Sequence, residues 1–340
     1  HAHPRLTRAI CEQAGRLMHT SNLFFIEPQA RLAEKLAQIS FGSRSFFCNS
    51  GAEANEAAIK LARKWASEHL TPKQRTIITA EKSFHGRTLA TVTATGQEKY
   101  QKPFAPLPGG FRYVPFGDLD AIEAAVDDTV CAIMLEPIQG EGGINVPDQR
   151  YLGGVRRLCD DRGILLMFDE VQTGIGRTGK WFGYEHFGIE PDIMTLAKSL
   201  GGGFPIGACV AKGEVATTFA PGDHASTFGG NHLACAAALE TLAIIEDEGI
   251  VANAAAMGTL LTKRFTKLAG EMTQIDHIRG RGLLLGLQLS VPVARELAAE
   301  SLKRGLVLNA IGVDLLRLAP PLVISAEQCE QAVGTIIEVL

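Results

Sequence analysis

Short apolar runs that recur at intervals of helical length are the feature of this sequence that most restricts its fold. Runs of about four to eight residues rich in Ile, Val and Leu predict buried strands, and helical spacers let neighbouring strands run parallel. The predicted strands are Phe46–Cys48, Thr76–Thr79, Val130–Leu135, Ile164–Phe168, Ile193–Leu196 and Ile206–Val210. We therefore expect an α/β fold with a mostly parallel sheet flanked by helices.

The alternating pattern changes near Glu248, where a smaller α+β unit is expected to begin. Its predicted elements are a long helix, strands at 282–289, 306–308 and 315–318, and a final helix from about Ala326. With 340 residues the chain is long for one compact domain, which agrees with this division. We expect an N-terminal segment at 1–28, a large domain at 29–248 and a small C-terminal domain at 249–340.

Charge and cysteine usage exclude several classes of function. Lys and Arg total 33 against 37 for Asp and Glu, so the chain lacks the basic excess of nucleic-acid-binding proteins. The seven cysteines are scattered and never form a Cys-x-x-Cys pair, which favours the cytoplasm. No apolar run is long enough for a membrane span, and no carboxylate or cysteine cluster joins His1, His3 and His19 to bind a metal. Small molecules are the expected ligands.

The segment Asn49–Asn55 follows a predicted strand and begins a predicted helix. Ser50 and Glu53 have the spacing of a capping box, and Gly51 allows a ligand to approach the backbone closely. Unpaired amides at the start of a helix favour an anion, so this segment is a candidate phosphate site. A capped helix without a ligand explains the same residues.

Charged residues end three successive predicted strands of the sheet. Glu136, Asp169 and Lys198 each stand where an apolar run stops, at the edge where open α/β sheets bind ligands. A carboxylate for a pyridine nitrogen, a lysine that can form a Schiff base and a phosphate site are together what pyridoxal phosphate requires. The alternative is that these charged strand ends are only hydrated.

Six motifs, in this order, resemble those of the class III aminotransferases. They are Ser50–Asn55, Phe84–Thr88, Glu136–Gly143, Asp169–Gly174, Leu196–Gly203 and Thr227–Asn231. The resemblance covers essentially the whole chain, and it implies fold type I of the pyridoxal phosphate enzymes. Members of the family carry a further N-terminal segment, which we expect this sequence to lack.

The resemblance also implies a set of cofactor contacts. Lys198 is expected to bond covalently to pyridoxal phosphate and to shuttle the proton, and Asp169 to hold the pyridine nitrogen. Phe84 would stack on the ring, and Gln172 would contact its phenolic oxygen. Phosphate contacts are expected from Ser50, Gly51, Ala52 and, supplied by the other subunit, Thr227. The active unit is therefore expected to be a homodimer with its active site at the subunit interface.

Substrate recognition is expected to depend on arginines, because both substrates carry carboxylates that a planar guanidinium binds well. The resemblance points to the branch that uses N-acetylornithine and 2-oxoglutarate. Arg87 resembles the arginine that holds the α-carboxylate of the donor, and Arg317 the one that takes the α-carboxylate of glutamate. Glu141 would cover Arg317 while the acetylated donor is bound, and a purely structural ion pair is the alternative. Ser226 is placed among the substrate contacts.

Other activities stay open within this resemblance. Succinylornithine, succinyl-diaminopimelate, ornithine and 4-aminobutyrate are alternative donors, because the acyl pocket has no motif. A pyridoxal phosphate aminomutase would share Lys198 and Asp169 without needing external 2-oxoglutarate. A non-catalytic relative would be expected to lose one of these two residues, and this sequence keeps both.

Overall fold

The larger of two sheets forms the centre of the structure, a computed structural model that describes residues 1–340. Its strand order is β1-β7-β6-β5-β4-β2-β3. The strands are β1 (Arg44–Cys48), β2 (Thr76–Ala80), β3 (Phe111–Val114), β4 (Val130–Leu135), β5 (Leu165–Asp169), β6 (Ile193–Leu196) and β7 (Gly207–Ala211). All neighbours pair in parallel except β7, which is antiparallel to both β6 and β1. The expected mostly parallel α/β sheet is confirmed.

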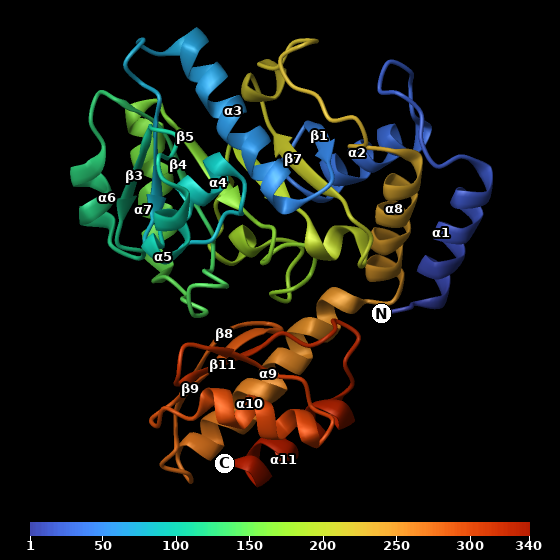
Figure 1. Cartoon of the computed structure of the whole chain (residues 1–340), viewed down its shortest axis with the longest axis vertical. Helices are drawn as coiled ribbons and strands as arrows, with labels where there is room; N and C mark the ends of the chain where they lie inside the picture. The colour runs from blue at the N-terminus through green and yellow to red at the C-terminus, as the bar shows by residue number, and fades with distance from the viewer.

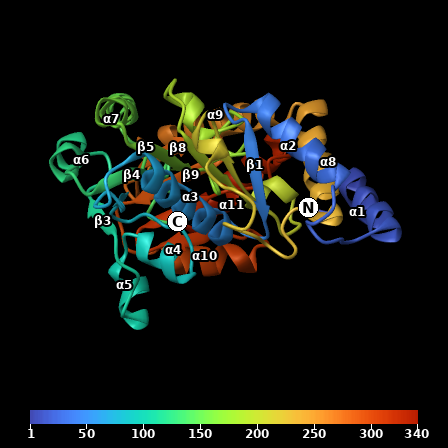
Figure 2. The ribbon, with the colours of Figure 1, turned by 90° about the horizontal axis from the view of Figure 1, so that it is seen from above.

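Helices pack on both faces of this sheet, so β4 and β5 are buried on both sides. The helices are α1 (Pro4–Arg16), α2 (Glu27–Ile39), α3 (Gly51–His69), α4 (Leu89–Ala94), α5 (Glu98–Gln101), α6 (Leu119–Ala125), α7 (Gln149–Arg162) and α8 (His232–Asp247). Figures 1 and 2 both show α1, α2 and α8 gathered beside β1, with β3 and α6 at the opposite end. None of the helices has the length and apolar character that a membrane span requires.

A second, antiparallel sheet lies in the lower lobe of Figure 1, which α9 enters from the upper lobe. The order of its strands is β10-β11-β9-β8. Its elements are α9 (Ile250–Ala269), β8 (Ile275–Arg281), β9 (Leu284–Leu289), α10 (Ala294–Lys303), β10 (Asn309–Ile311), β11 (Leu315–Leu318) and α11 (Ala326–Val339). The expected smaller α+β unit is present.

Three strands differ from the sequence prediction. We predicted neither β3 nor β8, because both carry polar residues and lie at sheet edges, where side chains stay partly exposed. The strand predicted at 306–308 is wrong, since β10 begins at Asn309. Leu306 and Leu308 pack on the core of the small lobe without joining its sheet, so hydrophobicity alone misplaced the strand.

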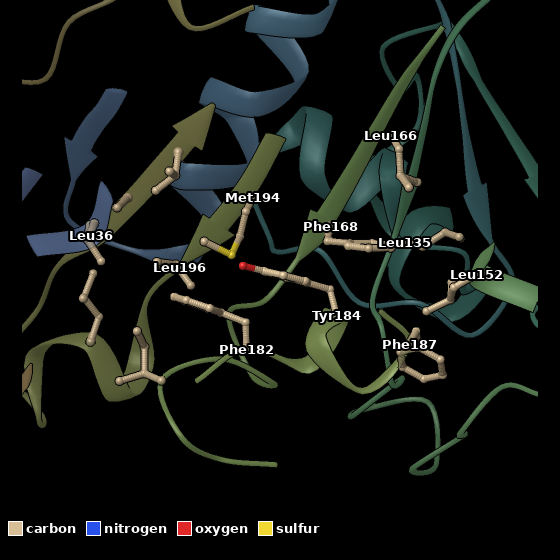
Figure 3. Packing of buried hydrophobic residues seen from close by; sticks show 14 of the residues in the cluster. Leu36, Leu135, Leu152, Leu166, Phe168, Phe182, Tyr184, Phe187, Met194 and Leu196 are labelled. Atoms are coloured by element: carbon tan, nitrogen blue, oxygen red, sulfur yellow. The ribbon is translucent and has the colours of Figure 1, made fainter. Parts of the chain in front are cut away.

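The core beneath the cavity described below is dense and aromatic. Figure 3 shows Phe182 and Tyr184 packed against Met194 and Leu196 of β6, with Phe168 of β5 nearby. The two aromatic rings of residues 182 and 184 stack with centroids 5.5 Å apart. Burying a large apolar side chain contributes about 1.5–3 kcal/mol. This packing holds the ends of β5 and β6 rigidly, and those ends carry the candidate catalytic residues.

Candidate active site

A cavity of about 460 Å³ opens at the carboxyl ends of β4, β5 and β6. This is the edge of an open α/β sheet at which ligands bind. The residues singled out from the sequence that line it are Ser50, Gly51, Ala52, Phe84, Arg87, Glu136, Asp169, Gln172 and Lys198. Larger hollows elsewhere, such as one of about 840 Å³ between α1, α2 and α8, contain none of these residues.

Asp169 is the most strongly held charged group of the cavity. It ends β5, is only 3% exposed, and its Oδ2 accepts hydrogen bonds from Asn55 Nδ2 and His85 Nδ1, both at 2.8 Å. The backbone amide of Val171 donates to its Oδ1 at 3.0 Å. A carboxylate with several fixed donors keeps one orientation, so Asp169 presents a stationary negative charge to the cavity.

Asn55 and His85 support Asp169, and sequence reasoning assigned them no role. Asn55 Nδ2 also donates to the carbonyl of His85 at 2.7 Å, while its Oδ1 accepts from Thr195 Oγ1 at 2.6 Å. Since a carboxylate only accepts hydrogen bonds, the proton of His85 lies on Nδ1. Its Nε2 is buried without a partner. Both residues belong to motifs quoted above, but only the fold shows that they contact Asp169.

Lys198 lies directly after β6, beside the strand that ends at Asp169. Its backbone has φ +43°, a left-handed conformation that costs a non-glycine residue about 1 kcal/mol or more. Its side chain is accessible from the cavity, but the surrounding protein lowers the pKa of the amine by desolvation. The charge of Asp169 opposes this shift without cancelling it. A lysine with a lowered pKa is the type that acts as a nucleophile or base.

Glu136 is a second buried carboxylate in the wall of the cavity. It directly follows β4 and is 4% exposed, and burial raises its pKa to about 7. Its two carboxylate oxygens accept the backbone amides of Phe84 and Gly140, each at 3.1 Å. Glu136 therefore joins the loop of Phe84 to the loop that carries Glu141.

The start of α3 lines one end of the cavity and is the candidate anion-binding site. Ser50 Oγ accepts the amide of Glu53 at 3.2 Å, which is one half of the predicted capping box. The other half is absent, because the Glu53 carboxylate accepts the backbone amide of Asn49, at 2.6 Å, and not that of Ser50. The backbone amides of Gly51 and Ala52 make no hydrogen bond within the chain. A Cβ on Gly51 would lie 2.8 Å from a methyl carbon of Val171, so the close approach of these two loops requires glycine. The unpaired amides suit an anion.

Arg317 and Glu141, which lie 176 residues apart in the sequence, form an ion pair. Arg317 projects from β11 of the small sheet, and Glu141 from the loop after β4. Arg317 also donates to Gln172 Oε1 at 3.3 Å. Gln172 lines the cavity, so it connects the ion pair to the site that contains Lys198.

Arg87 lies on the cavity wall and is exposed, and its guanidinium makes no hydrogen bond or ion pair. Its contacts are aromatic: it lies over the rings of Phe84 and Tyr100. Gly86, at φ +137°, makes the turn that separates exposed Arg87 from buried His85. Tyr100 was not identified from the sequence.

Ser226 and Thr227 lie outside this cavity, in the wall of a separate hollow of about 620 Å³. Ser226 Oγ accepts Asn49 Nδ2 at 3.2 Å, which is its connection to the lining of the main cavity. Thr227 is exposed. The fold therefore does not bring these two residues together with Asp169 and Lys198 within one chain. No group of three or more His, Cys, Asp or Glu side chains is arranged to hold a metal ion.

Comparisons with known proteins agree with this geometry. The family described as aminotransferase class-III matches residues 1–340. Acetylornithine aminotransferase of Caldanaerobacter subterraneus is 51% identical over 340 residues, covering all of this chain and 86% of the relative. The corresponding enzyme of Methanocaldococcus jannaschii is 48% identical over 343 residues, covering all of this chain and 85% of the relative.

Solved structures that are similar to this chain are also aminotransferases. Ornithine aminotransferase of Toxoplasma gondii has a TM-score of 0.95 at 35% identity, covering all of this chain and 82% of its own. Another structure of that enzyme contains pyridoxal phosphate at partial occupancy in its active site. N-acetylornithine aminotransferase of Stenotrophomonas maltophilia has a TM-score of 0.86 at 40% identity, covering all of this chain and 86% of its own.

Proposed function

The chain belongs to the class-III aminotransferase family, and from this premise we propose that it transfers the δ-amino group of N2-acetylornithine to 2-oxoglutarate. The donor becomes N-acetylglutamate 5-semialdehyde and the acceptor becomes glutamate, a reaction of arginine biosynthesis. The observation that carries the proposal is the Arg317–Glu141 pair beside the Lys198 cavity. An arginine that can be covered or exposed suits an enzyme whose donor has one carboxylate and whose acceptor has two.

Pyridoxal phosphate is the cofactor implied by the family, and the cavity residues fit it. The unpaired amides of Gly51 and Ala52 suit its phosphate, Asp169 suits a protonated pyridine nitrogen, and Phe84 offers an aromatic face. When bound, the cofactor supplies an electron sink for negative charge that develops on the substrate carbon. The experiments given in the Discussion test these assignments.

Asp169 is proposed to hold the proton on the pyridine nitrogen. The hydrogen bonds from Asn55, His85 and Val171 keep its carboxylate in one position before any substrate arrives. Such preorganised charge costs no rearrangement during the reaction, which is why it accelerates a step that develops charge.

Lys198 is proposed to anchor the cofactor and to move the proton at the substrate carbon. Desolvation by the surrounding protein lowers the pKa of its amine, so more of the neutral base is present near neutral pH than for a fully hydrated lysine. Lys198 follows the end of β6 in a left-handed backbone conformation, and its side chain lines the cavity. Its role as base requires this placement next to Asp169.

The arginines are proposed to sort the two substrates. Arg87 binds the α-carboxylate of acetylornithine, which leaves the δ-amine at the reacting end of the site, and later binds the distal carboxylate of glutamate. Arg317 is then unwanted for the donor and is neutralised by Glu141. When Glu141 moves away, Arg317 can bind the α-carboxylate of glutamate or 2-oxoglutarate.

A homodimer is proposed to complete the site. Thr227 is exposed outside its own cavity, beside the exposed side chain of Phe228. Leu23 lines the same hollow as Thr227, and it begins an exposed apolar run, Leu23–Phe25, with exposed fractions of 88%, 69% and 108%. Apolar surface of this kind marks a protein interface, and a second copy that covers it can receive Thr227 in its phosphate site.

We also retain residues 1–28, 29–248 and 249–340 as the proposed division of the chain.

A panel of amino donors tests the proposed activity. The purified protein is incubated with 2-oxoglutarate and acetylornithine, succinylornithine, succinyl-diaminopimelate, ornithine or 4-aminobutyrate, and glutamate formation is measured. We expect the highest kcat/KM with acetylornithine. A higher value for another donor would overturn the substrate assignment, and turnover without 2-oxoglutarate would indicate an aminomutase.

A further inference from the structure

Tyr100 contacts the candidate substrate arginine, and the proposed function leaves this tyrosine without a role. The guanidinium carbon of Arg87 lies 4.1 Å from the centroid of the Tyr100 ring and 5.4 Å from that of Phe84. The two rings meet nearly edge to face, with centroids 5.9 Å apart. Because Arg87 has no acidic partner, these aromatic rings are what its charged end contacts.

Hydrogen bonds from two glutamine side chains, one on each side of Tyr100 in the sequence, hold the short helix α5 in place. Gln97 Nε2 donates to the carbonyl of Ser83 at 2.9 Å, and Gln101 Nε2 donates to the carbonyl of Thr95 at 2.7 Å. No hydrogen bond engages the Tyr100 hydroxyl within the chain. The ring is therefore held in place by its backbone, and the hydroxyl is not needed to hold it.

An aromatic partner has a specific advantage for an arginine that must bind a carboxylate. An exposed arginine loses up to about 2 kcal/mol of rotamer entropy when a ligand fixes it, so prior restraint favours binding. An acidic partner would supply that restraint but would compete with the substrate. A ring restrains the guanidinium through its face and leaves the N–H donors free.

We propose that Tyr100 is a positioning residue that holds Arg87 ready to bind a substrate carboxylate. This inference rests on the proposed function of Arg87. The same ring has a second cationic neighbour, Lys99, whose Nζ lies 4.7 Å from the centroid. Lys99 therefore provides a matched control, because its removal leaves the contact between Arg87 and the ring intact.

Binding of glutarate, an unreactive dicarboxylate of the length of glutamate, measures the effect without chemistry. Calorimetry on the cofactor-loaded enzyme should show about 3- to 10-fold weaker binding for Tyr100→Leu, the range expected for loss of a partly exposed cation–π contact. KM for glutamate should rise similarly, while kcat stays within about twofold. Tyr100→Phe keeps the ring and should restore parental binding, and Lys99→Met should bind glutarate as the parent does.

A double-mutant cycle separates positioning from a general structural effect. In an Arg87→Ala background, Tyr100→Leu should cause no further loss of glutarate affinity. The same loss in both backgrounds would overturn the inference, as would unchanged binding in Tyr100→Leu alone. If Arg87→Ala itself leaves glutarate binding unchanged, the proposed carboxylate role of Arg87 is wrong, and the inference fails with it.

Discussion

The ion pair between Arg317 and Glu141 predicts that two substitutions will separate the two half-reactions. Glu141→Ala leaves Arg317 uncovered, with only Gln172 Oε1 nearby at 3.3 Å. Glutamate should then bind at least as well as to the parent. Acetylornithine should react more slowly, because the uncovered arginine captures its α-carboxylate in the wrong orientation. Arg317→Ala should have the opposite effect, weakening glutamate recognition more than donor recognition.

The burial of the pair sets the magnitude of this effect. The Arg317 side chain is 18% exposed and that of Glu141 is 34% exposed. Truncating one partner of a fully desolvated charge pair costs about 2–5 kcal/mol, whereas fully exposed pairs contribute about 0–1 kcal/mol. We take the lower end of the first range, about 2 kcal/mol, because solvent screens part of the interaction. This corresponds to roughly 30-fold weaker binding of glutamate to Arg317→Ala.

Single-turnover absorbance measurements on the cofactor-loaded enzyme test each half-reaction separately. Acetylornithine is mixed with one form of the enzyme and 2-oxoglutarate with the other, and rate and affinity are obtained for both. Arg279→Met is a matched control, because Arg279 joins the small sheet to the Glu141 loop only through the carbonyls of Gly143 and Ile144. This control should affect both half-reactions alike. Equal losses in both half-reactions for Glu141→Ala and Arg317→Ala would mean that the pair is only structural.

Three further substitutions probe the ionisable groups of the cavity. Asp169→Asn should retain cofactor binding by equilibrium dialysis but lose about 10²-fold or more in kcat, since a preorganised charge is removed; an unimpaired kcat would exclude Asp169 as the nitrogen partner. Lys198→Ala should fold, as judged by circular dichroism, but should show no turnover. Borohydride reduction of the parent enzyme should attach the cofactor to Lys198, as located by peptide mapping; attachment to another residue would refute the assignment. Burial raises the pKa of Glu136 from about 4.5 to about 7, so the folded state binds the proton of this carboxyl more tightly than the unfolded state does. The contribution of this proton to stability is therefore complete below pH 4.5 and is lost as the pH rises through 7. Urea unfolding of Glu136→Gln should therefore show a stability difference from the parent that shifts in favour of the variant between about pH 5 and pH 8; a constant difference would contradict the buried, proton-binding carboxylate.

Elements of the fold could be predicted where a short stretch of sequence carries a clear pattern, such as an apolar run or a helix cap. Strands β4, β5 and β6 are apolar runs buried on both faces, so hydrophobicity alone located them to within a residue or two. The cap of α3 at Ser50 depends on residues within one turn. Strand β8 lacks such a signal, because its polar, partly exposed side chains have the composition of a loop as much as of a strand. Strand β3 has only four residues, and Arg112 and Tyr113 interrupt its apolar run.

The candidate site divides in the same way. Placing Asp169 and Lys198 side by side required only that successive parallel strands end at the same edge of a sheet, and the spacing in the sequence implied this. The roles of Arg317 and Glu141 came from a resemblance to a known family, because no local rule connects residues 176 positions apart.

The sequence by itself determined which chemistry the chain can carry, through the residue types at its strand ends and the start of α3. Only the tertiary structure decided how those groups are held. Asn55 and His85 meet Asp169 across 114 and 84 residues, and Arg87 lies on the ring of Tyr100. Hydrogen bonds and cation–π contacts act over a few ångströms and depend on direction, so they exist only once packing has set the relative positions of the segments.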